Sequence, residues 1–307
     1  MPIIITGASG QLGRLVVDEL LHSVPANALV LITRTPEKLS SYANRGCKVR
    51  GGNFDHPQDL ISAFDGGEKM LLISGTRVGR RVEQHGAAID AAKRAGVKHV
   101  LYTTYIGVEY SANECEAVKD HRSTEELLRR SGLAWTALRH AQYANAVTDV
   151  MAQSAVQNRR LISVAGDGLM PFIWREDCAI ADAAAAAGPN TENKAYDITG
   201  PELMSFRQVA AMMAEFSGVP VDFRLTDVNG LYAMFDALGV PREPVDDLVA
   251  NGIPWNSNEM VSFEVAVRDG HFAVKSDDFK RLTGREPRTL RALFDAKSDQ
   301  IRSYTRG

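Results

Sequence analysis

Short apolar runs alternate with amphipathic segments over about the first 140 residues of the chain. The apolar runs predict strands at Ile3–Thr6, Leu29–Thr33, Lys48–Arg50, Met70–Ser74, His99–Thr104 and Trp135–Leu138. Several of these runs are continuously apolar, which is typical of parallel strands buried on both faces. The amphipathic segments predict helices at Gln11–His22, Gln58–Phe64, Arg81–Ala95 and Lys119–Arg130. This alternation predicts an α/β fold with a Rossmann-like, doubly wound parallel sheet.

The pattern loosens beyond about residue 140. A helix is predicted at Asp177–Ala187, a strand at Ala195–Ile198, and a further helix after the capping box Ser205–Gln208. The segment "LTGREPRTLRALFDA" predicts a turn into a last helix. We therefore expect a doubly wound domain at residues 1–145 and a smaller lobe at 146–307, partly threaded back into the first.

Composition excludes several classes of protein. The chain has 307 residues, 45% of them hydrophobic, and its 35 Lys and Arg against 38 Asp and Glu leave no basic block for nucleic acid or a membrane surface. Three cysteines without metal-ligand spacing predict neither a disulfide framework nor a metal site, and the histidines do not cluster. No secretory leader or apolar run of about 18 residues is found, so a cytoplasmic protein is expected.

Three glycines follow the first predicted strand at equal spacing in "ITGASGQLG". Gly7 suits a sharp turn, Gly10 allows close approach of the backbone, and Gly13 lets the following helix pack on the strand. The free amides of that helix N-terminus favour an anion, so a dinucleotide pyrophosphate is predicted here. The spacing is GxxGxxG and departs from the GxGxxG of the standard fingerprint.

The residue after the second predicted strand indicates which dinucleotide binds. NAD-selective sites place an acidic residue about 20 positions after the glycines to hold the ribose hydroxyl. Here "LITRTPEK" places Arg34 there, with Lys38 close by. A guanidinium suits a 2′-phosphate, which favours NADPH. The alternative is that Arg34 is a solvated loop cation.

Two further loops, "GNFD" and "ISGT", follow the third and fourth predicted strands at the positions of the adenine and the nicotinamide ribose. The residues predicted to bind the cofactor are Gly7, Ser9, Gly10, Gln11, Leu12, Gly13, Arg34, Lys38, Asn53, Phe54, Ser74, Gly75, Thr76 and Thr103, with His140 and Tyr143.

These motifs, together with "AGVKHVLYTTY" and "STEELLRRSGLAWTALR", resemble the NmrA-like group of atypical short-chain dehydrogenases. Within that group the sequence is similar to bacterial NADPH-dependent quinone oxidoreductases and triphenylmethane reductases. The resemblance spans most of the chain and implies NADPH and a substrate cleft under the C-terminal lobe. The family holds both reductases and regulators without turnover, so membership alone leaves the function open.

The Tyr-x-x-x-Lys pair of ordinary short-chain dehydrogenases is missing, because no lysine follows Tyr102, Tyr105 or Tyr110 at that spacing. The resemblance places a histidine where the lysine would be, and His121 matches it. The alternative is a surface histidine paired with Glu125.

The segment "LRHAQYANA" is expected to form the floor of the cleft. The resemblance predicts an asparagine at the position of His140 and a tyrosine at that of Tyr143, so His140 departs from the family pattern. His140, Tyr143 and His121 are the catalytic candidates, while a local packing role for His140 stays open. Tyr105, Phe172 and Trp174 are the candidates for substrate contact.

Direct transfer of a hydride from NADPH to a quinone-like acceptor is the favoured function, because such an acceptor can take its proton from water. Two alternatives stay open. One is a reductase of an enone, imine or aryl compound with a histidine as proton donor. The other is a non-catalytic NADP(H) sensor, and a homodimer is left open in each case.

Overall fold

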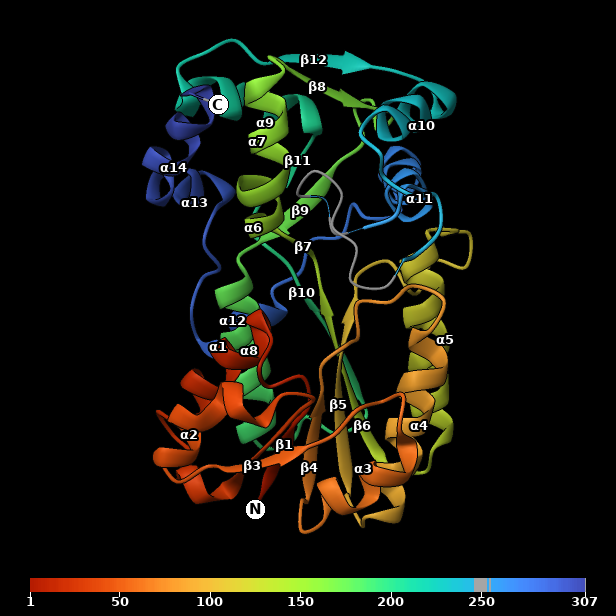
Figure 1. The fold of residues 1–307 in the computed structure, drawn as a ribbon, viewed down its shortest axis with the longest axis vertical. Helices are drawn as coiled ribbons and strands as arrows, with labels where there is room; N and C mark the ends of the chain where they lie inside the picture. The colour runs from red at the N-terminus through yellow and green to blue at the C-terminus, as the bar shows by residue number, and fades with distance from the viewer. Residues whose placement is uncertain (246–252, 254, 307) are drawn as a thin grey trace.

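A parallel sheet of seven strands occupies the lower half of the molecule in Figure 1. In this computed structural model residues 1–245, 253 and 255–306 are described. The strands are β1 (Ile3–Ile5), β2 (Leu29–Thr33), β3 (Lys48–Gly51), β4 (Lys69–Leu72), β5 (His99–Tyr105), β6 (Ala134–His140) and β10 (Lys194–Ile198). They lie in the order β10-β6-β5-β4-β1-β2-β3, and all neighbours run parallel. The predicted doubly wound sheet is confirmed.

The chain winds in opposite directions from β1, which pairs with β2 on one side and β4 on the other. Ligands of such sheets bind beyond the carboxyl ends of the strands at this switch point. The loops that begin near Gly7, Arg34, Asn53 and Ser74 all leave from that edge. Residues far apart in the sequence are thereby brought to one side of the molecule.

Two helical layers cover the sheet (Figure 1). One holds α1 (Gln11–Leu20), α2 (Ser40–Asn44), α8 (Arg175–Ala187) and α12 (Asp278–Thr283), and the other holds α3 (Pro57–Phe64), α4 (Arg81–Arg94) and α5 (Glu116–Arg130). Strand β1 is continuously apolar because both of its faces are buried: Ile3 and Ile5 pack against the first helical layer and Ile4 against the second.

The remaining strands and α-helices lie above the sheet in Figure 1. Strands β7 (Gln142–Tyr143), β9 (Met170–Ile173) and β11 (Leu203–Met204) form one small sheet, and β8 (Arg160–Ser163) pairs with β12 (Asp222–Leu225). The helices are α6 (Ala144–Ala146), α7 (Ala152–Gln157), α9 (Phe206–Ser217), α10 (Val228–Ala237), α11 (Ser257–Arg268), α13 (Leu290–Ala296) and α14 (Ser298–Ser303). Short 3₁₀ or π turns occur at Ala26–Ala28, Pro36–Leu39, Val147–Met151 and Tyr304–Arg306.

Some predicted boundaries were wrong in ways that bear on the site. Strand β6 continues to His140, so that residue is the last of a buried strand and not part of a loop. Strand β4 ends at Leu72, which leaves Ser74 in the loop. The capping box of Ser205 and Gln208 is confirmed, with both of its hydrogen bonds present.

The segment beyond residue 145 returns to the main sheet. Helix α8 packs beside α1, and β10 forms the edge strand next to β6. The division at residue 145 stays a prediction. No helix in the described ranges is long and apolar enough to cross a membrane.

Candidate functional site

The glycine turn after β1 leaves the start of α1 open. Gly7 has a φ of +61°, a backbone conformation that residues other than glycine rarely adopt. Gly10 is the N-cap of α1 and has no side chain to bond the amides of the first turn. Gly7, Gly10 and Gln11 are exposed at this point, whereas Leu12 is buried and faces the core. An exposed, uncapped helix N-terminus at the carboxyl edge of the sheet fits a pyrophosphate.

Basic side chains gather around the loop after β2. Arg34 is exposed, and its guanidinium has no hydrogen bond or ion pair to any residue that the structure describes. The Arg14 guanidinium donates to the carbonyl oxygens of Ser9 (3.1 Å) and Lys38 (2.9 Å). The hydroxyls of Ser9 and Thr33 lie 2.7 Å apart. These bonds tie the glycine turn to the loop that carries Arg34 and Lys38.

Arg14 was missed by the sequence analysis. It stands directly after Gly13, in the second turn of a helix whose first turn was already assigned to the cofactor. Arg14 could have been recognised by its position on the side of α1 that faces the loop after β2. That position is evident only when the arrangement of α1 and this loop is known.

The loop after β3 is anchored to the start of α4. Asn53 accepts a hydrogen bond from the amide of Asp55, whose carboxylate accepts from Gln84 (2.7 Å) and Arg77 (3.3 Å). The ring of Phe54 meets the ring of His85 edge-on, at a centroid distance of 6.3 Å. The GNFD loop is therefore fixed against the loop that follows β4.

Buried side chains hold the loop after β4 in place. The Ser74 amide donates to Thr103 Oγ1 (2.9 Å), and the Gly75 amide donates to His85 Nε2 (3.0 Å). The Arg81 guanidinium donates to the carbonyl oxygens of Gly75 (2.8 Å) and Thr76 (3.3 Å). Thr103 is buried, so it supports the loop from behind. Thr76 is exposed at the tip of the loop.

His85 is neutral in this arrangement. Its Nε2 atom accepts from the Gly75 amide, so Nδ1 must carry the hydrogen, and Nδ1 lies 3.1 Å from Thr124 Oγ1. Burial is the main cause that lowers the pKa of His85 to about 3, and Arg81 adds to it. His85 was also missed, because nothing in the sequence distinguishes it from a core histidine.

Arg81 also links this loop to helix α11. It is buried, and its guanidinium lies 3.8 Å from carboxylate oxygens of both Asp120 and Glu259. Burial raises the pKa of Glu259 to about 7 despite the opposing attraction of Arg81. A segment more than 170 residues away in sequence thus contacts the loop that follows β4.

His121 is buried and does not pair with Glu125, so the surface alternative was wrong. Its Nδ1 atom lies 2.7 Å from the hydroxyl of Tyr102, and its ring stacks near that of Tyr105 at 6.3 Å. Burial lowers the pKa of His121 well below its ordinary value. Glu125 instead binds Arg139, at 3.0 Å. His121 is therefore a neutral group beneath the tyrosines at the end of β5.

His140 lies between Tyr143, another catalytic candidate, and Asp182, which the sequence analysis did not single out. Its Nδ1 atom lies 3.0 Å from the Tyr143 hydroxyl and its Nε2 atom 2.8 Å from Asp182 Oδ1. His140 and Asp182 are buried, whereas Tyr143 is half-buried. Burial raises the pKa of Asp182, and the His140 imidazole opposes that rise. Tyr105 on β5 is in register with His140 on β6, and its hydroxyl donates to Gln142 Oε1 (2.7 Å).

Phe172 and Trp174 are more enclosed than Tyr105, the third substrate candidate. Phe172 lies beside Gln142 in the β7–β9 pair and packs on Phe206. Trp174 is 9% exposed, and its Nε1 donates to the Thr289 carbonyl oxygen (2.8 Å). The structure brings Phe172 next to the strand that ends at Tyr143, and the contact of either ring with substrate stays a prediction.

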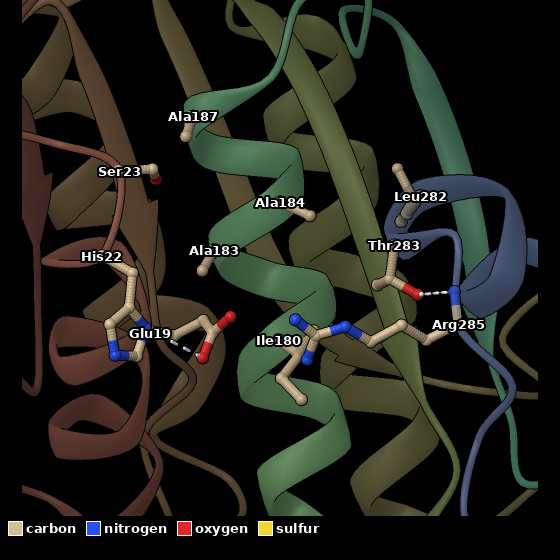
Figure 2. A pocket seen from close by; sticks show the side chains of 10 residues that line it. All are labelled: Glu19, His22, Ser23, Ile180, Ala183, Ala184, Ala187, Leu282, Thr283 and Arg285. Carbon is tan, nitrogen blue, oxygen red and sulfur yellow. Dashed lines mark hydrogen bonds and ion pairs between the residues drawn. The ribbon is translucent and has the colours of Figure 1, made fainter.

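A separate hollow of about 220 Å³ lies between α1, α8 and α12 (Figure 2). Glu19 and Arg285 extend toward it from opposite sides. His22 and Ser23, which also line it, follow the C-terminus of α1, whereas the glycine turn precedes its N-terminus. Ten helical residues span about 15 Å, so this hollow is remote from the glycine turn.

Residues 7–165 match the NAD(P)H-binding family. Quinone oxidoreductase 2 of Escherichia coli is 34% identical over 249 residues, which cover 81% of this chain and 86% of that protein.

Two solved structures are similar over almost their whole length. One is the NADPH-dependent quinone oxidoreductase of Escherichia coli in complex with NADPH, with a TM-score of 0.86, 31% identity and coverage of 96% and 99% of the two chains. The other is the triphenylmethane reductase of a Citrobacter species in complex with NADP(H), with a TM-score of 0.83, 29% identity and coverage of 96% and 100%. The family resemblance read from the sequence is confirmed.

Proposed function

Because the chain belongs to the NAD(P)H-binding family, we propose that it is an NADPH-dependent reductase that gives a hydride to a quinone or a similar conjugated, electron-poor molecule. The relatives described above are oxidoreductases, and the solved structure from Escherichia coli is NADPH-dependent. The finer parts of the proposal are the acceptor and the roles of individual residues.

One observation carries the preference for NADPH. The loop after β2 presents Arg34 at the place where NAD-selective sites present an acid, and its guanidinium is exposed and free of ion pairs in the described part of the chain. Arg14 and Lys38 lie in the same region, because the Arg14 guanidinium bonds the Lys38 carbonyl oxygen. Three positive charges around one loop favour a dianionic phosphate over a neutral hydroxyl.

The residues of the site fit the other parts of the dinucleotide. The open start of α1, with Gly7 and Gly10, would hold the pyrophosphate, and Asn53 and Phe54 would lie along the adenine. The loop held by His85 would carry the nicotinamide ribose. When bound, the cofactor supplies the hydride, and the protein supplies position and exclusion of water.

The acceptor class follows from the groups at the ends of β5 and β6. Tyr105 and Tyr143 are half-buried there, and aromatic side chains of this kind pack on flat conjugated molecules. None of Tyr102, Tyr105 and Tyr110 is followed by a lysine at the spacing of ordinary dehydrogenases. A quinone spreads the charge of an incoming hydride over its oxygens, so it does not need such a pair. A cytoplasmic location and a homodimer stay predictions.

Steady-state oxidation of NADPH with 1,4-benzoquinone tests the proposal. We expect saturable turnover with NADPH, and a much lower kcat/KM with NADH. Tight binding of NADPH with no turnover on quinones would instead support the sensor, and turnover limited to other acceptors would refute the quinone assignment.

A further inference from the structure

Tyr143, His140 and Asp182 form a continuous hydrogen-bonded chain at the end of β6. The Tyr143 hydroxyl lies 3.0 Å from His140 Nδ1, and His140 Nε2 lies 2.8 Å from Asp182 Oδ1. The three residues come from β7, β6 and α8, and Asp182 is 42 residues from His140 in sequence. Asp182 was not among the residues predicted from the sequence.

The hydrogen-bonded series has a buried end, formed by His140 and Asp182, and an outer end at Tyr143. Both side chains are almost fully buried, and Asp182 Oδ2 has no hydrogen-bond partner in the described residues. A carboxylate in that position needs a positive neighbour, and the imidazole is the group in contact with it. Its oxygen can only accept, so Nε2 of His140 must donate to it. The outer member, Tyr143, is the half-buried one, and it follows the carboxyl end of β6, which is the edge of the sheet where ligands of such folds bind.

Few other titratable groups lie close enough to exchange protons with Tyr143, His140 and Asp182. Arg175 and Cys178 on α8 face Tyr143, and the Arg175 guanidinium lies 5.2 Å from the centre of its ring. Tyr105 on β5 and His121 on α5 are the other titratable neighbours. Burial raises the pKa of Tyr143 well above its ordinary value, so its hydroxyl keeps a hydrogen to donate at neutral pH.

We propose that Tyr143 is the proton donor to the hydride-reduced acceptor, that His140 replaces its proton, and that Asp182 is a positioning residue that holds His140 as an imidazolium. The proposal deepens the proposed function, on which it rests. It assigns to the site neutral acceptors, such as enones, whose hydride adducts are strong bases.

The atoms balance in this scheme. An enone that accepts the hydride at its β-carbon becomes an enolate. The O–H bond of Tyr143 breaks as a new O–H bond forms on the enolate, and the Nδ1–H bond of His140 breaks as the Tyr143 hydroxyl is restored. The neutral imidazole stays bonded to Asp182, and a proton from water recharges it through Tyr143 once the product has left.

A pair of acceptors separates this role from a structural one. The adduct of 1,4-benzoquinone is a weak base, whereas that of 4-phenylbut-3-en-2-one is a strong base. We expect Tyr143→Phe, which keeps the ring but loses the hydroxyl, to lower kcat for the enone by at least about 30-fold more than kcat for the quinone. Asp182→Asn is expected to lower the enone kcat by about tenfold or more, with the same selectivity. Tyr304→Phe, which removes a hydroxyl that donates to the Thr148 carbonyl oxygen and has no bond to the three residues of the relay, is the control and should change neither rate.

Equal losses on both acceptors, or no loss on either, would overturn the relay, as would a wild-type protein that reduces the quinone but not the enone. A wild-type protein that reduces neither acceptor would sink the proposed function itself. A readout without turnover covers that case: nitrogen NMR of the His140 ring in the protein without cofactor. Hydrogens on both ring nitrogens in the wild type, with one lost in Asp182→Asn, support the relay, and a neutral ring in the wild type contradicts it.

Discussion

A Cβ atom on Gly13 would lie 2.3 Å from the carbonyl oxygen of Gly7. The contact is with backbone, which cannot move aside cheaply, so the turn after β1 and the first turn of α1 fit only without a side chain at that position. The glycine spacing of the sequence is thus explained by a close approach inside the turn as well as by space for a ligand.

Gly13→Ala is therefore expected to destabilise the fold by about 1–3 kcal/mol and to weaken NADPH binding, because the extra methyl pushes the turn away from α1. Thermal unfolding and NADPH titration measure the two effects. Gly86→Ala in α4 is the matched control, since its Cβ would meet only Leu127, at 3.4 Å. Equal behaviour of the two variants would contradict this explanation.

Removing His85 should loosen the loop after β4. His85→Leu leaves the Gly75 amide without its acceptor, which we expect to cost about 1–3 kcal/mol and to raise KM for NADPH. The exposed His22 provides the control His22→Leu, expected to change neither quantity. An unchanged KM in His85→Leu would show that this bond does not shape the cofactor site.

The pH dependence of stability tests the state of the same residue. Because the folded pKa of His85 is about 3, the unfolded chain binds an extra proton between that value and about 6.5. Its contribution to stability is therefore full above about pH 6.5 and falls as the pH is lowered through that window. The stability difference between wild type and His85→Leu, followed by denaturant titration from pH 7 to 4, should shrink accordingly. A difference that stays constant or grows on acidification would rule out a neutral buried His85.

Glu259 should behave in the opposite sense. Its folded pKa of about 7 exceeds its ordinary value, so its contribution is present below about pH 4.5 and is lost as the pH rises through 7. Gln resembles the protonated form, and Glu259→Gln should gain stability relative to wild type between pH 5 and 8, by at most about 3 kcal/mol. The control is Glu83→Gln, which removes an exposed carboxylate of α4.

Arg34→Ala should erase most of the preference for NADPH. The loss of charge-assisted bonds to a 2′-phosphate corresponds to about 10- to 100-fold weaker binding of NADPH, with NADH little changed. Arg94→Ala, at the exposed end of α4, is the control. If NADPH and NADH were weakened equally in Arg34→Ala, that residue would not contact the 2′-phosphate.

Local patterns predicted the sheet well and the details of the site poorly. The run at Leu29–Thr33 matches β2 because continuous apolar residues suit a strand buried on both faces. The contacts between Arg81 and Glu259 and between His140 and Asp182 join segments far apart in sequence, and no periodicity encodes them. Strands β8 and β12 were missed because each has only four residues and carries no buried apolar run, Ser163 being the one fully buried residue of the two strands.

The same limit explains His121 and His140. Both were chosen by their place in motifs, but whether a histidine lies on a surface or beneath two tyrosines depends on how α5 packs on the sheet. Sequence alone could equally support the surface pairing of His121 with Glu125, which the fold replaces by the bond to Tyr102.

The most direct test of the account is calorimetric titration of the wild-type protein with NADPH and with NADH. We expect one site per chain and a Kd for NADPH at least about tenfold lower than that for NADH, because Arg34 and its neighbours act on the 2′-phosphate alone. Equal affinities, or no heat with NADPH, would contradict it.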